Sequence, residues 1–408
     1  MATQPRRRPR RDPRQETRRE TRGARGDHQS RSDPGNRLMR LQIFDSLDDL
    51  PRHYLRMLEV VGAHNMFQSL GWFRNLLENT RNPGDRMRIY GVETQEAPAS
   101  ALAFFVALDR RNPSAFLKPA TLEEFYNFYT LETGPIVSPE AERIEDVIDF
   151  LVQGISAETP RWDIVQFGSI NRPSPVFDAL CTSLRRHGMT IEPFFRHGNW
   201  YEDIAGRTLE QYINSRGKAA KETLRKSRKL DREHDTDWSV VTGTERMERA
   251  VAAYWTIYEE SWKEPEIYPR FMPRLFDVCA DDGSFRLGIL YVDGEPAAAQ
   301  LVTMYGRNAV MFKTAYVPKF AKHSSGAIVM ARMLRHLICE DRIARIDFGA
   351  GDEPYKAHWA SQRRERWGIV ARNTRTPLGA VLGATNQARS WAKTAVRAAR
   401  RVPPRDTP

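Results

Sequence analysis

The spacing of apolar residues along the second half of the chain alternates between a period typical of strands and a period typical of helices. Residues 237–243 (DWSVVTG) predict a short strand, and the apolar side chains of residues 244–262 fall on one helical face. Three apolar runs follow, at 285–292, 296–304 and 309–317, separated by Asp-Gly and Gly-Arg-Asn segments that favour tight turns. This pattern predicts an antiparallel meander after a strand and a helix.

Further elements are expected on both sides of the meander. A second helix is predicted between the Pro269 region and the meander. Beyond the meander, the pattern predicts a helix, a strand, a helical turn that begins with proline, and a last strand, at 325–340, 343–348, 354–359 and 367–372. The predicted order of this half is therefore β-α-α-β-β-β-α-β-α-β.

The first half of the chain repeats part of this pattern. The hairpin sequence MRIYGVETQEAPASALAFFV at 87–106 aligns with FRLGILYVDGEPAAAQLVTM at 285–304, with similar strand and turn lengths. A helix is predicted before the first hairpin, at 67–77, and a helix and a strand after it, at 144–155 and 163–167. We therefore expect two tandem domains of one mixed α/β fold.

Charge separates the two ends of the chain from its middle. Residues 1–36 contain 11 arginines against 5 acidic residues, and residues 376–408 contain 6 basic residues against 1 acidic residue. The remaining residues, 37–375, hold 46 basic and 46 acidic side chains. A basic core that binds nucleic acid is thus not expected.

The two predicted tandem domains lie within this neutral part of the chain, at residues 37–205 and 206–375.

The two charged tails differ in apolar content. Residues 1–36 bury too little apolar surface to offset the entropy of ordering, which predicts a disordered, Arg-rich tail. Residues 380–402 instead place small apolar residues and Trp391 at helical spacing among arginines, as a basic amphipathic helix does. This helix is expected to be either a solvated terminal helix or a peripheral membrane contact.

Cysteine usage and hydropathy predict a cytoplasmic protein, with peripheral membrane contact through the basic tails left open. Cys181, Cys279 and Cys339 lie far apart without a CxxC pair, which favours a reducing compartment over a disulfide scaffold. The histidines show no spacing typical of metal ligands, so no metal is expected. The longest apolar run, residues 98–108, is shorter than the ~20 residues of a membrane helix.

One long motif carries a family resemblance. The sequence PKFAKHSSGAIVMARMLRHLICEDRIARIDFGAGDEPYKAHWA, at 318–360, resembles the CelD-like branch of the GNAT acyltransferases, which is related to the FemAB-type double-GNAT transferases. The segments FQSLGW at 67–72 and LRKSRKL at 224–230 extend the resemblance to roughly residues 39–372. It implies two tandem GNAT-like domains. It also implies that acyl-CoA enters between two splayed strands of a mixed sheet.

The donor site is expected where the last meander strand leads into the helix at 325–340. Free backbone N–H groups at a helix N-terminus favour an anion such as a pyrophosphate. The predicted donor-binding residues are those of this loop: Lys319, Lys322, Ser324, Ser325, Gly326 and Ala327. The loop departs from the widespread GNAT pattern Arg/Gln-x-x-Gly-x-Gly/Ala. Capping of the helix by a serine, with glycine relieving a turn, is the alternative interpretation.

Catalytic candidates follow in the string DFGAGDEPYK, which supplies Asp347, Asp352, Glu353, Tyr355 and Lys356. Acyl transfer needs removal of a proton and stabilisation of an oxyanion. Asp352 is predicted to accept the proton if desolvation raises its pKa. The resemblance implies that Lys356 lies near the reacting carbonyl. Alternatively, the acids cap the turn and Tyr355 is a core aromatic residue.

A basic stripe lies on the helix predicted at 209–234, which is expected to bridge the two domains. Lys221, Arg225 and Arg228 belong to this stripe. A solvated face is one interpretation, and a cleft that holds a phosphate-bearing or anionic acceptor is the other.

The function predicted from the sequence is an acyl-CoA-dependent N-acyltransferase. Its acceptor is expected to be a small molecule or saccharide, namely an amino sugar, an amino acid or an envelope polysaccharide precursor. An aminoacyl-tRNA-dependent FemAB-type transferase and a non-catalytic GNAT-fold scaffold are the alternatives. No specific nucleic-acid partner is expected, and the oligomeric state is left open.

Overall fold

Residues 38–111, 118–281 and 283–385 are described by the structure, which is a computed structural model. The tail predicted to be disordered, 1–36, lies outside the described residues, as does most of the amphipathic helix predicted at 380–402. Residues 377–385 are helical. Among the described residues, no helix combines the length and hydropathy needed to span a bilayer.

The second half has the element order that the apolar pattern predicts. At most element ends, the observed boundary differs from the predicted boundary by a few residues. The elements are β8 (Thr236–Val241), α6 (Met247–Glu260), α7 (Phe271–Asp281), β9 (Phe285–Val292), β10 (Glu295–Tyr305), β11 (Asn308–Tyr316), a 3-10 turn at Pro318–His323, α8 (Ser325–Cys339), β12 (Arg345–Ala350), α9 (Lys356–Trp359) and β13 (Gln362–Asn373).

The first half repeats this order, with one short extra strand, β5, and 3-10 turns at Leu47–Asp49 and Met66–Gln68. The prediction of two tandem units of one mixed α/β fold is thus confirmed. The elements are β1 (Met39–Phe44), α1 (Arg52–Gly62), α2 (Leu70–Thr80), β2 (Arg86–Thr94), β3 (Ala101–Asp109), β4 (Thr121–Glu124), β5 (Ile136–Val137), α3 (Ile144–Ala157), β6 (Ile164–Arg172), α4 (Pro175–Arg186) and β7 (Met189–Asp203).

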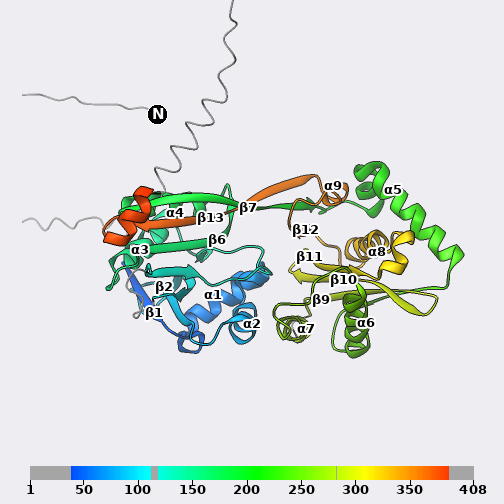
Figure 1. The fold of residues 1–408 in the computed structure, drawn as a ribbon, viewed down its shortest axis with the longest axis horizontal. Coiled ribbons are helices and arrows are strands. Elements are labelled where there is room, and N and C mark those ends of the chain that lie inside the picture. Colours follow the sequence, from blue (N-terminus) through cyan, green and yellow to red (C-terminus); the bar gives the residue numbers. More distant parts are fainter. Residues whose placement is uncertain (1–37, 112–117, 282, 386–408) are drawn as a thin grey trace, which may run out of the picture. The chain divides into compact units, whose positions relative to one another are not determined.

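The last strand of each half pairs with the other half (Figure 1). β13 runs antiparallel to β6 of the first half, β7 runs antiparallel to β12 of the second half, and β7 and β13 pair with each other from Gln362↔Tyr201 to Asn373↔Met189. The strand order is β1-β2-β3-β4-β6-β13-β7-β12-β11-β10-β9-β8, with β5 beside β3. The predicted boundary between residues 205 and 206 therefore divides the sequence but not the sheet.

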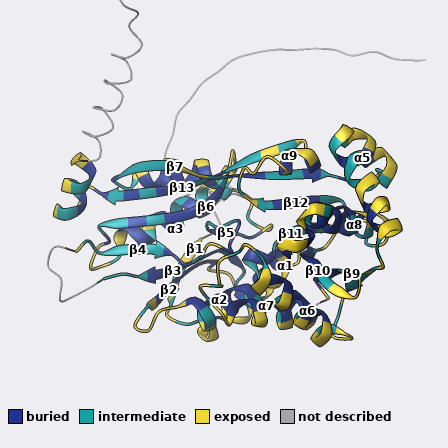
Figure 2. Cartoon of the chain, turned by 45° about the vertical axis from the view of Figure 1, so that its right-hand side comes forward, coloured by how far each residue is buried: buried dark blue, intermediate teal, exposed yellow. Residues whose placement is uncertain are grey.

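Apolar side chains from both halves also share a core. The ring of Trp72 on α2 meets Phe271 on α7 edge to face, with centroids 5.3 Å apart. Asn75 Nδ2 donates a hydrogen bond to the backbone oxygen of Phe271 at 3.2 Å. Figure 2 shows most of the sheet buried and exposed residues on the outer sides of α5, α6 and α7. The helices thus bury one apolar stripe each, as their sequence periods predict.

The helix between the halves, α5 (Leu209–Glu233), is broken. It begins with a capping box in which Thr208 and Gln211 exchange side-chain and backbone hydrogen bonds. Gly217 has a φ of 73°, a left-handed conformation that favours glycine and ends the first helical segment. α5 packs on α8 and α9, and Ala220 of its second segment is fully buried. α8 and α9 belong to the second half, whereas Arg216 of α5 pairs with Glu202 on β7 of the first half, so the helix contacts both halves as expected.

Candidate active site

The parallel pair β11 and β12 separates after a few residues. The pairing runs from Asn308↔Arg345 to Val310↔Asp347, and among the described residues these strands make no further ladder with each other. The rest of β11 therefore presents backbone N–H and C=O groups without a neighbouring strand on that side. A cavity of about 750 Å³ opens there, lined by β11, β12, α5, α8, α9 and the loop after α6.

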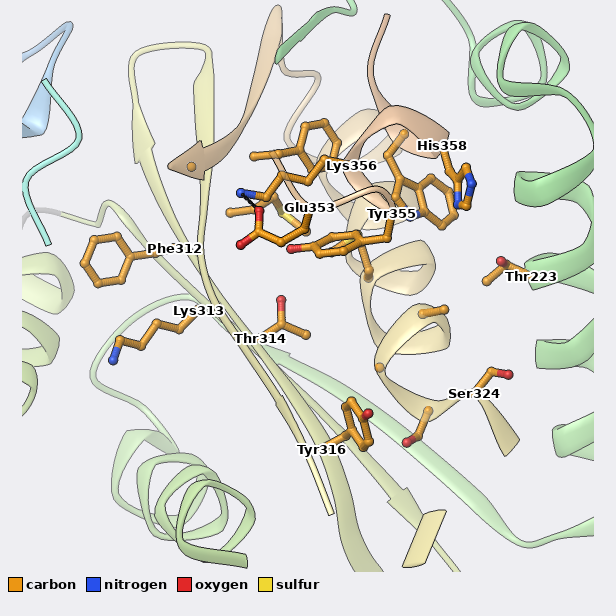
Figure 3. A pocket seen from close by; sticks show the side chains of 18 of the residues that line it. Thr223, Phe312, Lys313, Thr314, Tyr316, Ser324, Glu353, Tyr355, Lys356 and His358 are labelled. Carbon is orange, nitrogen blue, oxygen red and sulfur yellow. Dashed lines mark ion pairs between the residues drawn. The ribbon is translucent and has the colours of Figure 1, made fainter. Parts of the chain in front are cut away.

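A β-bulge shapes the wall formed by β11. Leu301 of β10 pairs with Lys313 and the next residue pairs with Met311, so Phe312 is the extra residue. The buried Gln300 fixes this bulge. Its Nε2 donates to the backbone oxygen of Lys313 at 3.1 Å, and its Oε1 accepts from the Thr314 hydroxyl at 2.6 Å. In Figure 3 Phe312 and Lys313 lie toward one end of the cavity, and Tyr316 and Ser324 toward the other.

The N-terminus of α8 forms that other end. Ser324 precedes the helix with a φ of 62°, and Ser325 is fully buried. Ser325 is among the residues that line the cavity, and its buried hydroxyl has no hydrogen-bond partner within the described part of the chain. Gly326 lets the helix approach β11, because a Cβ there would lie 2.7 Å from Cδ1 of Tyr316. The structure thus brings together Ser324, Ser325, Gly326 and Ala327 as the sequence predicts.

The cation near this helix start is not one of the predicted lysines. Lys319 forms an ion pair with Glu295, Lys322 is exposed, and neither lines the cavity. Instead, Lys226 on α5 donates from Nζ to the Ser324 hydroxyl at 3.1 Å. The basic segment LRKSRKL contains Lys226, but the sequence does not reveal which of its cations faces α8.

Lys356 lies in the cavity wall with its ammonium group already bonded. Nζ donates to the backbone oxygens of Ala350, at 2.5 Å, and Gly351, at 3.5 Å, and pairs with Oε2 of Glu353 at 2.9 Å (Figure 3). Its side chain is only 4% exposed. An ammonium has three N–H donors, so Lys356 holds the turn after β12 and fixes the Glu353 carboxylate. Its predicted role at the reacting carbonyl stays a prediction.

Tyr355 and Glu353 provide titratable groups inside the cavity. Burial, together with the nearby Glu353 carboxylate, raises the pKa of Tyr355 to about 12. The phenol therefore stays protonated near neutral pH. Figure 3 shows the two side chains close together on the wall formed by the α9 region.

Comparisons with known proteins identify a family for most of the second half. A family profile described as "Acetyltransferase (GNAT) domain" matches residues 217–357. The chain carries a GNAT domain. This match spans the splayed strands, the start of α8 and Lys356. A search of curated proteins finds no match.

A comparison with solved structures finds several similar folds. FemX has a TM-score of 0.55 at 10% sequence identity, with 84% of this chain and all of FemX covered. The C-terminal domain of a putative lysylphosphatidylglycerol synthetase from Agrobacterium fabrum has a TM-score of 0.45 at 13% identity. The match covers 70% of this chain and 85% of that domain. A tandem GNAT protein from the clavulanic acid biosynthesis pathway has a TM-score of 0.43 at 10% identity. The match covers 81% of this chain and 98% of that protein.

The two predicted aspartates lie outside the GNAT domain's large cavity. Arg363 donates to both carboxylate oxygens of Asp352, at 2.7 and 2.8 Å, and these hydrogen bonds lower its pKa. The raised pKa predicted for a proton acceptor is therefore wrong for Asp352. Asp347 pairs with Arg364 and lines a separate cavity of about 200 Å³. Glu353 is the acidic side chain of this string that the large cavity contains.

The predicted basic stripe on α5 faces away from the cavity. Lys221, Arg225 and Arg228 are exposed and none of them lines it. Arg225 instead forms two hydrogen bonds with Glu222 on the same helix. This placement favours the solvated-face interpretation. Within the described ranges, no group of three or more His, Cys, Asp or Glu side chains is placed to hold a metal ion.

The corresponding position in the first half is closed. β4 and β6 also pair in parallel only over Thr121↔Ile164 to Glu123↔Gln166. The loop after β4 folds back into the gap, where the buried Glu124 accepts hydrogen bonds from the backbone of Gly134 and Gly168. Burial raises the pKa of Glu124 to about 7. A cavity of about 20 Å³ remains beside this loop, too small for a cofactor.

Proposed function

We propose that the GNAT domain transfers an acyl group from acyl-CoA to an amine of a small-molecule or saccharide acceptor. The observation that carries this proposal is the large cavity between β11 and β12. It ends at a helix N-terminus, where the buried Ser325 hydroxyl has no partner among the residues that the structure describes. A pyrophosphate suits such a helix start, and Lys226 adds positive charge beside it. The pantetheine arm would pair with the free backbone edge of β11, as an added strand does.

The chemical step would take place between β11 and the Glu353–Tyr355 wall. The amine nitrogen attacks the thioester carbonyl, a C–N bond forms and the C–S bond breaks. Glu353 accepts the proton that the amine loses, directly or through water. Tyr355, with a pKa of about 12, donates a proton to the departing CoA thiolate. Glu353 then releases its proton to solvent and Tyr355 recovers one, so the products are an amide and free CoA.

Lys356 would support this step through Glu353. Its ion pair with Glu353 and its bonds to the Ala350 and Gly351 oxygens hold the carboxylate at the cavity wall. A fixed acid or base reacts faster than a mobile one because less freedom is lost in the transition state.

The similarity to FemX favours one second candidate, an aminoacyl-tRNA-dependent transferase of the FemAB type. Both candidates need the same fold and differ in the donor. The size of the cavity suits a nucleotide-linked thioester.

The test is direct turnover with the full-length chain. Purified protein is incubated with acetyl-CoA or longer acyl-CoAs and a panel of amino sugars, amino acids and saccharide precursors. Free CoA and the acylated product are followed by chromatography and mass spectrometry, because Cys339 is exposed and would react with thiol reagents. The proposal predicts CoA release that depends on the acceptor. Consumption of aminoacyl-tRNA without turnover of any acyl-CoA would favour the second candidate.

A further inference from the structure

The lysines in the cavity wall differ in whether they form an ion pair with a carboxylate. Three lysines line the cavity. Lys356 pairs with Glu353, and Lys313 pairs with Glu266. Lys263, in the loop after α6, forms no ion pair with any residue in the described ranges. Among the described residues of this wall, one cation is thus without a carboxylate partner, and it lies 5.5 Å from the centre of the Trp262 ring.

The pairing of Lys313 is reinforced from the first half. Glu266 accepts a hydrogen bond from the Tyr129 hydroxyl, and the Lys313 ammonium lies 4.9 Å from the centre of the Tyr129 ring. It also lies 5.2 Å from the centre of the Tyr258 ring. Glu266 is therefore committed to Lys313 and the tyrosine and does not neutralise Lys263 by direct contact.

Lys263 interacts through charge with two carboxylates, Glu266 and Glu353, and forms an ion pair with neither. Burial lowers its pKa, while the charges of Glu266 and Glu353 act to raise it. A partly buried ammonium without a counter-ion costs free energy, which a bound anion recovers. The two carboxylates nearby would repel a doubly charged phosphate more than a carboxylate. A single negative charge fits this position best.

We propose that the acceptor is an amine that also carries a carboxylate, such as an amino acid, and that Lys263 binds this carboxylate. The acceptor's amino group then faces Glu353, so the zwitterion meets one cation and one anion of the wall in complementary order. This inference rests on the proposed acyl transfer and narrows its acceptor from the wider set of amines.

The test compares matched acceptor pairs that differ only in this charge. Alanine and alaninamide, β-alanine and β-alaninamide, and lysine and lysinamide are assayed with acetyl-CoA and the full-length chain. Wild type, Lys263→Met and Lys229→Met are compared, with product formation followed by mass spectrometry. Lys229 is an exposed lysine on α5 outside the cavity, paired with Glu233, and serves as the control position.

We expect at least one acid to exceed its amide about tenfold or more in kcat/KM, a ratio equivalent to ~1.4 kcal/mol. Lys263→Met should remove this preference, mainly through KM for the acid, and leave kcat for the amide within a few-fold. Lys229→Met should keep the preference for the acid. The inference would be overturned if the wild type used acids and amides equally, or if the preference for acids survived Lys263→Met. It would also be overturned if Lys263→Met lowered kcat/KM equally for acids and amides.

Failure of the inference is distinguishable from failure of the proposed function. Turnover of neutral amines with no acid accepted would retain acyl transfer and refute the role of Lys263. If calorimetry detected no CoA binding to the wild type, both would be refuted.

Discussion

Gly326→Glu is the substitution that bears most directly on the donor site. Gly326 is the second residue of α8, and its missing side chain is what lets the helix start approach the Tyr316 ring. A Cβ at 2.7 Å from the Tyr316 Cδ1 atom forces the ring or the helix to move. The rest of the glutamate would enter the cavity with a negative charge where the pyrophosphate is expected.

The expected effect of Gly326→Glu has a steric part, which acts on folding, and an electrostatic part, which acts on CoA binding. Overpacking of this kind costs about 1–3 kcal/mol of folding free energy. One carboxylate about 5 Å from one phosphate charge, at an effective dielectric constant of about 20, costs about 3 kcal/mol of binding free energy. That corresponds to a loss of CoA affinity of at least about 100-fold.

The assay is calorimetric titration of CoA into the wild type and three variants. Gly326→Ala introduces the clash without the charge and should weaken binding less than Gly326→Glu. Cys339→Glu adds the same charge at an exposed position at the other end of α8 and should bind CoA as the wild type does. Thermal melts check that each variant is folded. Unchanged CoA affinity in folded Gly326→Glu would refute the donor site.

Three further substitutions and one deletion separate catalytic from structural roles. Lys356→Met should cost about 1–3 kcal/mol of stability, because the Ala350 oxygen and Glu353 lose their donor, and should also lower kcat. Glu353→Gln should lower kcat about 100-fold and change the pH-rate profile, whereas Asp352→Asn should stay within a few-fold. Deleting residues 1–36 should leave the melting temperature nearly unchanged, because the core elements begin at residue 39.

Each of these has a clear contrary outcome. A stable Lys356→Met protein with kcat reduced 100- to 1000-fold would show a free oxyanion donor rather than a clamp. A larger rate loss in Asp352→Asn than in Glu353→Gln would restore Asp352 as the proton acceptor. A drop of many degrees in melting temperature after the deletion would show that residues 1–36 pack on the core.

Local pattern was sufficient to predict most of the fold. The meander was predicted because turn residues separate three apolar runs, and the helix at 325–340 because its apolar face recurs at 3.6 residues. The exchange of β7 and β13 between the halves was not predictable in this way. Both strands mix apolar and polar residues, and nothing local tells such a strand which distant partner it will pair with.

The placement of the candidate residues was predictable where it follows from the order of backbone elements, and was not predictable where it depends on tertiary partners. The start of α8 needs only a strand, a turn and a helix in sequence. The choice of Asp352 failed because Arg363, which lies on β13, sets its pKa. Lys226 was missed because only the packing of α5 on α8 brings it to Ser324. The break at Gly217 had a visible signal, since glycine within a helix is unfavourable.

The central claim is that the donor binds between β11 and β12 of the second half and not in the first half. Amide hydrogen exchange of the full-length chain, measured with and without saturating CoA, tests it most directly. We predict slower exchange at residues 311–317 and 324–328, where the free strand edge and the helix start lie, and no change at 121–137. Protection confined to the first half, or no protection at 324–328 under saturation, would contradict the account.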